Sequence, residues 1–194
     1  MDNAALKTAP MIQASMIQAS VVEAPLIDGP LSSLPLNGAP LNGAPLSGEP
    51  LVAAARAIAT IAHRGQADKL GADYILHPAR VAARLAEPVE VAVAWLHDVV
   101  EDSDITSEDL LKAGIPPEAV AAVVLLTRPS GDREGQDPDA YYRALRENPL
   151  ALAVKRADIA DNMDPNRTEQ LPAVQRERLR AKYEHALEVL AGRD

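Results

Sequence analysis

The stretch VAWLHDVVED, residues 93–102, places a histidine and an aspartate in the middle of an apolar helical run. Burying an unpaired carboxylate is costly, so His97 and Asp98 need a metal ion or a partner of opposite charge. Glu101 and Asp102 follow one turn later on the same surface of a helix. Four ionisable groups at one end of an apolar helix indicate a metal site; a helix end with a solvated face is the alternative.

Residues 51–194 read as helices on both sides of this stretch. The predicted helices cover 51–66, 77–87, 89–101, a short segment capped by Thr106 and Asp109, 117–127, 139–147, 149–162 and 172–190, with a loop over 129–138. No stretch alternates with period two for long enough to predict a strand. Because Phe is absent and aromatic residues make up 3% of the chain, Ala, Leu and Val must form the core. We therefore predict an all-α helical bundle.

The first 50 residues have a different composition. MIQAS occurs twice over 11–20, and a Pro-Leu step then recurs at 25, 30, 35, 40, 45 and 50. Proline every fifth residue forbids a continuous helix, so we predict a Pro/Leu-rich low-complexity tail over 1–50, flexible or polyproline-like. A pentapeptide solenoid is the alternative, but its ladder needs donors that proline lacks. The organisation is thus a tail, 1–50, followed by one domain, 51–194.

Composition excludes several classes of function. The absence of cysteine rules out disulfides and thiolate metal sites, leaving the hard ligands His, Asp and Glu. The net charge of −9 argues against a nucleic-acid polymer as a partner, although a small phosphorylated ligand remains compatible with it. Neither a signal peptide nor a membrane span is evident, so we expect a cytoplasmic protein with no membrane partner. The sequence leaves the oligomeric state open.

Candidate metal ligands occur on three separate predicted elements. His77 begins the second helix, His97 and Asp98 lie near the end of the third, and Asp158 lies late in the helix over 149–162. Two imidazoles and two carboxylates could hold one divalent ion in a bundle core. Spacing alone does not bring them together, and a buried His or Asp is commonly a core residue with a satisfied hydrogen bond.

Four blocks of the sequence resemble the HD-domain phosphohydrolases in their order and spacing. The blocks are AHRGQ at 62–66, YILHP at 74–78, LHDVVED at 96–102 and VKRAD at 154–158. Specifically, they are similar to the hydrolase domain of the Rel/Spo alarmone enzymes and its free-standing small relatives, over roughly residues 52–167. The resemblance implies an all-helical HD-domain fold that binds a divalent metal, manganese by preference, through His77, His97, Asp98 and Asp158.

The same resemblance implies roles for other residues. Glu101 and Asp102 would position or deprotonate the attacking water, as general bases placed one turn beyond the ligands. Asn162 would contact the nucleotide. Lys69 and Lys155 match basic positions that contact phosphate, with solvated surface lysines as the alternative.

The implied activity is removal of the 3′-pyrophosphate from guanosine 3′,5′-bis(diphosphate), a small nucleotide substrate. Residues 163–194, which follow Asn162, are too few for the synthetase domain of the long enzymes, so we expect hydrolysis without synthesis. Two departures weaken the match to an alarmone substrate: Asp68 stands where the family has an arginine that stacks on guanine, and Ile159 stands where a basic residue is frequent. Asp68 is the feature that favours another nucleotide such as NADPH. A non-catalytic nucleotide sensor is the remaining alternative, against which the Glu101-Asp102 pair argues.

Overall fold

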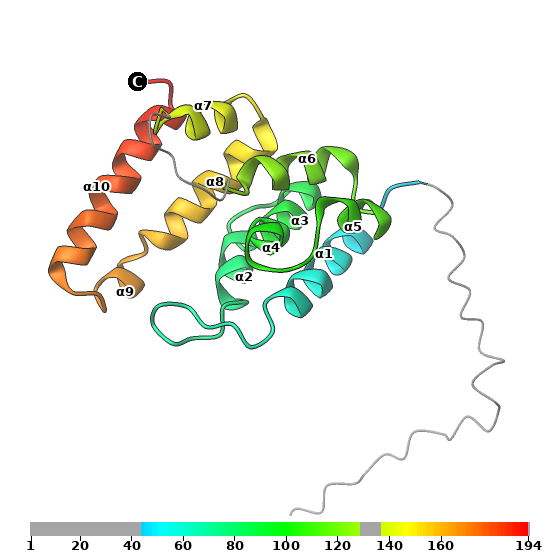
Figure 1. Cartoon of the computed structure of the whole chain (residues 1–194), viewed down its shortest axis with the longest axis horizontal. Helices are drawn as coiled ribbons and strands as arrows, with labels where there is room; N and C mark the ends of the chain where they lie inside the picture. Colours follow the sequence, from blue (N-terminus) through cyan, green and yellow to red (C-terminus); the bar gives the residue numbers. More distant parts are fainter. Residues whose placement is uncertain (1–43, 129–136, 194) are drawn as a thin grey trace, which may run out of the picture. The chain divides into compact units, whose positions relative to one another are not determined.

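The computed structural model describes residues 44–128 and 137–193, and these residues form an all-α domain (Figure 1). This confirms the predicted fold class; the only β-type pairing within these ranges is an isolated bridge between Ala67 and Asp73. The helices are α1 Gly48–Ala62, α2 Leu76–Ala82, α3 Pro88–Leu96, α4 Val99–Asp102, α5 Ser107–Lys112, α6 Pro117–Leu126, α7 Ala140–Arg146, α8 Pro149–Asn162, α9 Pro165–Thr168 and α10 Ala173–Leu190. The predicted tail, as far as residue 43, and residues 129–136 of the predicted loop lie outside the described residues.

Local sequence signals explain where most helices begin. A proline occupies the first turn of α3, α6, α8 and α9, where its missing N–H costs nothing. Before α5, the Thr106 side chain accepts the N–H of Asp109, and the Asp109 carboxylate accepts the N–H of Thr106. This confirms the predicted capping box.

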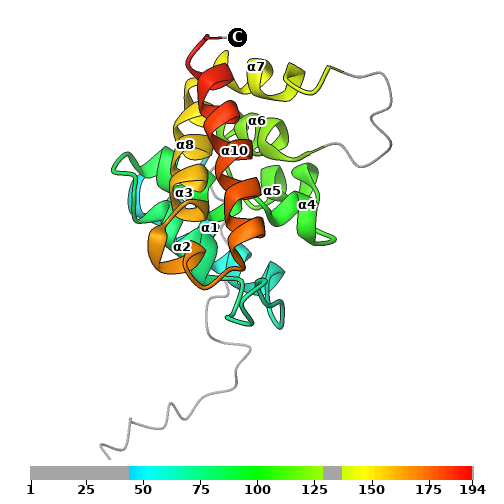
Figure 2. The ribbon, with the colours of Figure 1, turned by 90° about the vertical axis from the view of Figure 1, so that its left-hand side faces the viewer.

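Helix α3 lies at the centre of the domain. It contacts α1, α2, α6 and α8, and its Ala92, Val93, Ala94 and Leu96 are buried. Short side chains on these helices allow close packing, as expected for a core poor in aromatic residues. On the other side of α8, α10 packs against α7 and α8 (Figure 2). No helix in the described ranges is long and apolar enough to cross a membrane.

The prediction of one continuous helix over 89–101 is wrong, because the structure has two helices here. The chain leaves the helix at His97 and Asp98 and resumes as α4, so that α3 and α4 are separate elements. The Nδ1–H of His97 donates to the carbonyl oxygen of Ala94 at 2.6 Å, and Asp98 adopts φ −105° and ψ −5°. Both side chains face the same site, with Oδ2 of Asp98 at 3.1 Å from Nε2 of His97.

Other elements also differ from the predictions, and helix α1 ends at Ala62 instead of the predicted 66. Helix α1 begins at Gly48, three residues before the predicted start, and the Leu46 N–H donates to the carbonyl of Gly114. Helix α2 ends at Ala82, before the predicted 87. Helix α9 was not predicted; its first turn is capped by the Asp164 carboxylate, which accepts the N–H of Asn166.

Adjacent leucines of α5 test the packing directly. Leu110 is fully buried, whereas Leu111 is 46% exposed. We expect Leu110→Ala to lower the free energy of unfolding by about 2–5 kcal/mol, through lost burial and a residual cavity. Leu111→Ala should change it by less than about 0.5 kcal/mol. Urea unfolding of both variants measures the difference, and equal losses would contradict the packing described.

Candidate metal and substrate site

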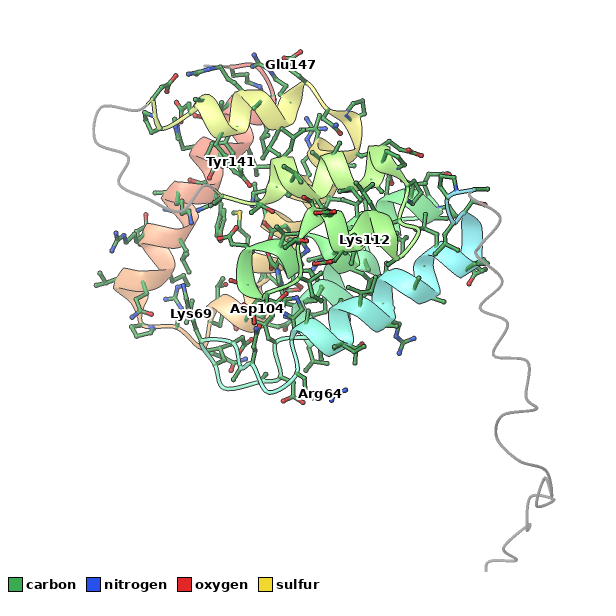
Figure 3. All side chains as sticks on the ribbon, turned by 45° about the vertical axis from the view of Figure 1, so that its right-hand side comes forward. Arg64, Lys69, Asp104, Lys112, Tyr141 and Glu147 are labelled. Atoms are coloured by element: carbon green, nitrogen blue, oxygen red, sulfur yellow. The ribbon has the colours of Figure 1, made fainter. Side chains whose placement is uncertain are left out.

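A cavity of about 470 Å³ opens on the side of the domain where α10 faces the broken helix. Its walls come from the loop between α1 and α2, the α3–α4 junction, α8, α9 and α10. Figure 3 shows Lys69 on that loop, and Figures 1 and 2 show how α8 and α10 run beside each other. The volume is in the range of pockets that enclose small-molecule ligands.

Three of the four predicted ligands lie together in this cavity. Ligand atoms of His77, His97 and Asp98 are all within 4.8 Å of one another. The Oδ2 atom of Asp98 lies 3.1 Å from Nε2 of His97 and 3.7 Å from Nε2 of His77. Helix α2 supplies the first histidine, and the break between α3 and α4 supplies the other two residues.

The fourth predicted ligand, Asp158 on α8, lies next to His77. Its Oδ1 atom lies 3.3 Å from Nε2 of His77. The same carboxylate accepts hydrogen bonds from Lys155, at 2.7 Å, and from Asn162. Both histidines and Asp158 are almost completely buried. The structure therefore brings together all four side chains that the sequence singled out as ligands.

Both imidazoles are oriented by hydrogen bonds at Nδ1. His77 donates to the Asp161 carboxylate at 2.8 Å, and His97 donates to the Ala94 carbonyl. Both Nε2 atoms therefore point toward carboxylate oxygens, and within the described residues Nε2 of His97 is buried without a hydrogen-bond partner. Lone pairs facing carboxylates repel unless a positive charge lies between them. This donor set and its orientation fit a divalent cation.

The pKa values show the same electrostatic preference. Burial alone would lower the pKa of His97, but the charge of Asp98 raises it to about 9. Burial would raise the pKa of Asp158, but the hydrogen bond from His77 and the charge of Lys155 hold it well below its ordinary value. The carboxylates thus stay ionised and favour positive charge at the centre of the cluster.

Sequence reasoning missed the carboxylate behind His77. Asp161 is fully buried and accepts hydrogen bonds from His77, Arg80 and Arg167. Burial would raise its pKa, but the hydrogen bonds from His77 and Arg80 lower it. A signal existed, since Asp161 lies three residues after Asp158 and Arg80 three residues after His77, each pair on one face of a helix.

The two predicted general bases occupy different positions. Glu101 lines the cavity, and its Oε2 atom accepts the N–H of Arg128 at 2.9 Å. Asp102 does not line the cavity; its carbonyl accepts a hydrogen bond from Gln66. Burial and the negative charges of Asp98 and Glu101 raise the pKa of Asp102.

The predicted substrate contacts Lys69, Lys155 and Asn162 all line the cavity. Three further cations, Arg128, Arg167 and Lys182, line it as well and were not predicted; of these, Arg167 pairs with Asp68 and Asp161. Within the described residues, no carboxylate forms an ion pair with Lys69, Arg128 or Lys182. Burial and the charges of Arg128, Lys155 and Lys69 lower the pKa of Lys182, so these cations are close enough to repel one another. Such a cluster favours an anionic ligand.

Asp68 and Ile159, which depart from the family pattern, have different surroundings. Asp68 lines the cavity, but its Oδ1 accepts the N–H groups of Leu70 and Ala72, and its Oδ2 pairs with Arg167 at 3.4 Å. Its negative charge is therefore partly offset. Ile159 is buried in the core and does not line the cavity.

Comparisons with known proteins agree with this picture. No protein-family model matches the chain. It is 47% identical over 57 residues to guanosine-3′,5′-bis(diphosphate) 3′-pyrophosphohydrolase of Vibrio cholerae, covering 27% of this chain and 8% of that protein. It is 30% identical over 148 residues to GTP pyrophosphokinase of Streptomyces coelicolor, covering 72% of this chain and 17% of that protein. The chain thus spans less than a fifth of the length of either relative.

A solved structure shares the fold. A metazoan ortholog of SpoT, described as hydrolysing ppGpp, superposes with a TM-score of 0.58 at 22% identity, over 77% of this chain and 90% of that one. The described part of the chain is thus similar in sequence to parts of Rel/Spo enzymes and shares its fold with a solved structure of this kind.

Proposed function

We propose that this chain is a manganese-dependent phosphohydrolase that releases pyrophosphate from the 3′ position of guanosine 3′,5′-bis(diphosphate). The observation that carries the proposal is the pair of imidazole Nε2 atoms facing two carboxylates inside a cavity. The other lining of this cavity includes cations that form no ion pair with any described residue. Relatives named for this activity support the choice of substrate. A cytoplasmic location stays a prediction of the sequence.

His77, His97, Asp98 and Asp158 would hold the cation. When bound, a divalent cation polarises a phosphoryl oxygen and lowers the pKa of a water molecule. Manganese suits this mixture of imidazole and carboxylate ligands. The hydrogen bonds at Nδ1 of both histidines keep the Nε2 lone pairs available for it.

The residues of the chain supply the rest of the chemistry. Water attacks the phosphorus next to the 3′-oxygen, and Glu101 accepts a proton of the water. The bond from the 3′-oxygen to phosphorus breaks, the 3′-oxygen takes up a proton from solvent and becomes the free 3′-hydroxyl, and the phosphorus leaves as pyrophosphate. One Glu101 oxygen is held by the Arg128 N–H, which leaves the other for the proton. Asp102, with its raised pKa and its place outside the cavity lining, would act through its charge.

Cations of the cavity would bind the phosphates of the substrate. Lys69, Arg128 and Lys182 bring positive charge to a protein whose net charge is −9, so they offset a field that otherwise repels nucleotides. Lys155 is held against Asp158 and would approach the phosphate beside the cation. Asn162, which also binds Asp158, would contact the nucleotide.

A second candidate substrate is another phosphorylated nucleotide, such as NADPH. The observation that favours it is Asp68, a carboxylate in the cavity lining. Its contact with Arg167 offsets that charge and keeps the alarmone as the first choice.

Removing one proposed ligand should abolish metal binding. We expect His97→Ala to weaken manganese affinity by more than about 100-fold, since even the loss of an outer-shell partner costs about 10–100-fold. The matched control is His185→Ala, because His185 is exposed and pairs with Asp139 outside the cavity. Calorimetric titration with manganese measures both, and unchanged affinity in His97→Ala would refute the ligand assignment.

Glu101→Gln should separate metal binding from turnover. The amide keeps the shape but cannot accept the proton, so kcat should fall by about 10²–10⁴-fold while manganese affinity stays at the wild-type value. Glu118→Gln, on an exposed position of α6, is the control. Loss of manganese from Glu101→Gln would instead make Glu101 a ligand.

A panel of nucleotides with manganese tests the substrate. We expect pyrophosphate release from guanosine 3′,5′-bis(diphosphate), measured by phosphorus NMR. Release of orthophosphate from NADPH, with the alarmone unchanged, would favour the second candidate. Tight binding without turnover of any nucleotide would leave a sensor and contradict the enzyme.

A further inference from the structure

Asp161 is the most completely enclosed charge in the described part of the site. It has no exposed surface, yet it carries no ligand role, because its carboxylate points to Nδ1 of His77 and not to the centre of the cluster. Arg80 donates to it twice, at 2.8 and 3.2 Å, and Arg167 donates once, at 3.0 Å. Such a network keeps a buried carboxylate ionised and fixed in place.

Arg167 extends this network to the wall of the cavity. Its Nη1 atom donates to Asp161, and its Nη2 atom lies 3.4 Å from Oδ2 of Asp68. Asp68 in turn accepts the N–H groups of Leu70 and Ala72 through its other oxygen. One guanidinium thus connects the carboxylate behind a metal ligand to the backbone of the loop that carries Lys69.

We infer that Asp161, Arg167 and Asp68 form a connection that couples the metal site to the 68–72 loop of the substrate cavity. Asp161 and Arg167 are positioning residues. Asp161 orients His77, and Arg167 holds the 68–72 loop through Asp68 when Asp161 is fixed in place. The inference rests on the proposed function only in that the site binds a divalent cation; it does not depend on which nucleotide is cleaved.

The coupling requires the planar fork of arginine. A guanidinium donates to two carboxylates in fixed directions, whereas the ammonium of lysine is a single point charge on a flexible stem. Arg84 provides a comparison, because it pairs with Asp164 and lies 3.9 Å from Asp161. Within the described residues, neither a hydrogen bond nor an ion pair joins it to the 68–72 loop. Tyr74 offers an alternative connection between the proposed metal site and the 68–72 loop, because it follows this loop in the chain and its hydroxyl donates to the Asp98 carboxylate at 2.6 Å.

The first part of the test is metal affinity. We expect Asp161→Asn to weaken manganese binding by about 10–100-fold, as for other outer-shell partners of metal-bound histidines. Asp164→Asn is the matched control: it lies near the same helix end and pairs with an arginine, but it contacts no histidine. Calorimetry gives the affinities, and circular dichroism confirms that each full-length variant is folded. Wild-type affinity in a folded Asp161→Asn would contradict the role of Asp161.

The second part measures the loop without any substrate. Hydrogen exchange of the amides over 68–72 is recorded for the wild-type chain with and without manganese. We expect manganese to slow this exchange in the wild type and in Arg84→Lys, but not in Arg167→Lys, which leaves the contact between Asp161 and His77 in place. In Tyr74→Phe the slowing should persist.

Two results with the variants would overturn the inference. In the first, manganese still slows hydrogen exchange over 68–72 in Arg167→Lys; in the second, this slowing is lost in Tyr74→Phe instead. A wild-type chain that binds manganese without any change at 68–72 would overturn it as well. Because no nucleotide is present, a wrong substrate leaves these results unchanged, whereas a wild type that binds no manganese would contradict both the coupling and the metal-dependent function.

Discussion

The structure depends on one electrostatic constraint: two imidazole nitrogens and two carboxylates converge where water is largely excluded. Each histidine is held at Nδ1 by an acceptor, so that Nε2 is directed at a carboxylate oxygen. Without a positive charge this arrangement is repulsive, and burial strengthens the repulsion. The raised pKa of both histidines shows that the site favours positive charge, which a divalent cation would supply.

Three parts of the fold bring these groups together: α2, the α3–α4 junction and α8. The α3–α4 break directs His97 and Asp98 to one point, and α8 supplies both Asp158 and, three residues on, the carboxylate that orients His77. Helix α3 is anchored by apolar contacts with four neighbouring helices, so the break is held on a rigid element. Packing of the core and geometry of the site are thus two consequences of the same central helix.

The sequence was sufficient for the fold class and for the ligand cluster, but for different reasons. Helix starts at Pro88, Pro117 and Pro149 follow from local signals that act within one turn. The proposed ligands could be named because their blocks resemble those of a known family. The break at residues 97–98 was not, since neither glycine nor proline marks it and the apolar pattern continues through it.

Other features depend on contacts between distant elements. Arg128 and Lys182 line the cavity because the end of α6 and the middle of α10 face the broken helix, and no local pattern encodes that packing. The sequence also presented Asp68 as a charge opposed to phosphate. Its partner Arg167, separated by 99 positions, changes that interpretation. Side chains whose role depends on such partners require the folded structure.

A single divalent cation held by His77, His97, Asp98 and Asp158 would be visible by anomalous diffraction at the manganese absorption edge, from crystals of the full chain grown with manganese. We expect one strong anomalous peak within coordination distance of both Nε2 atoms and both carboxylates. A peak elsewhere, or none at this cluster in a well-ordered crystal with manganese present, would contradict it.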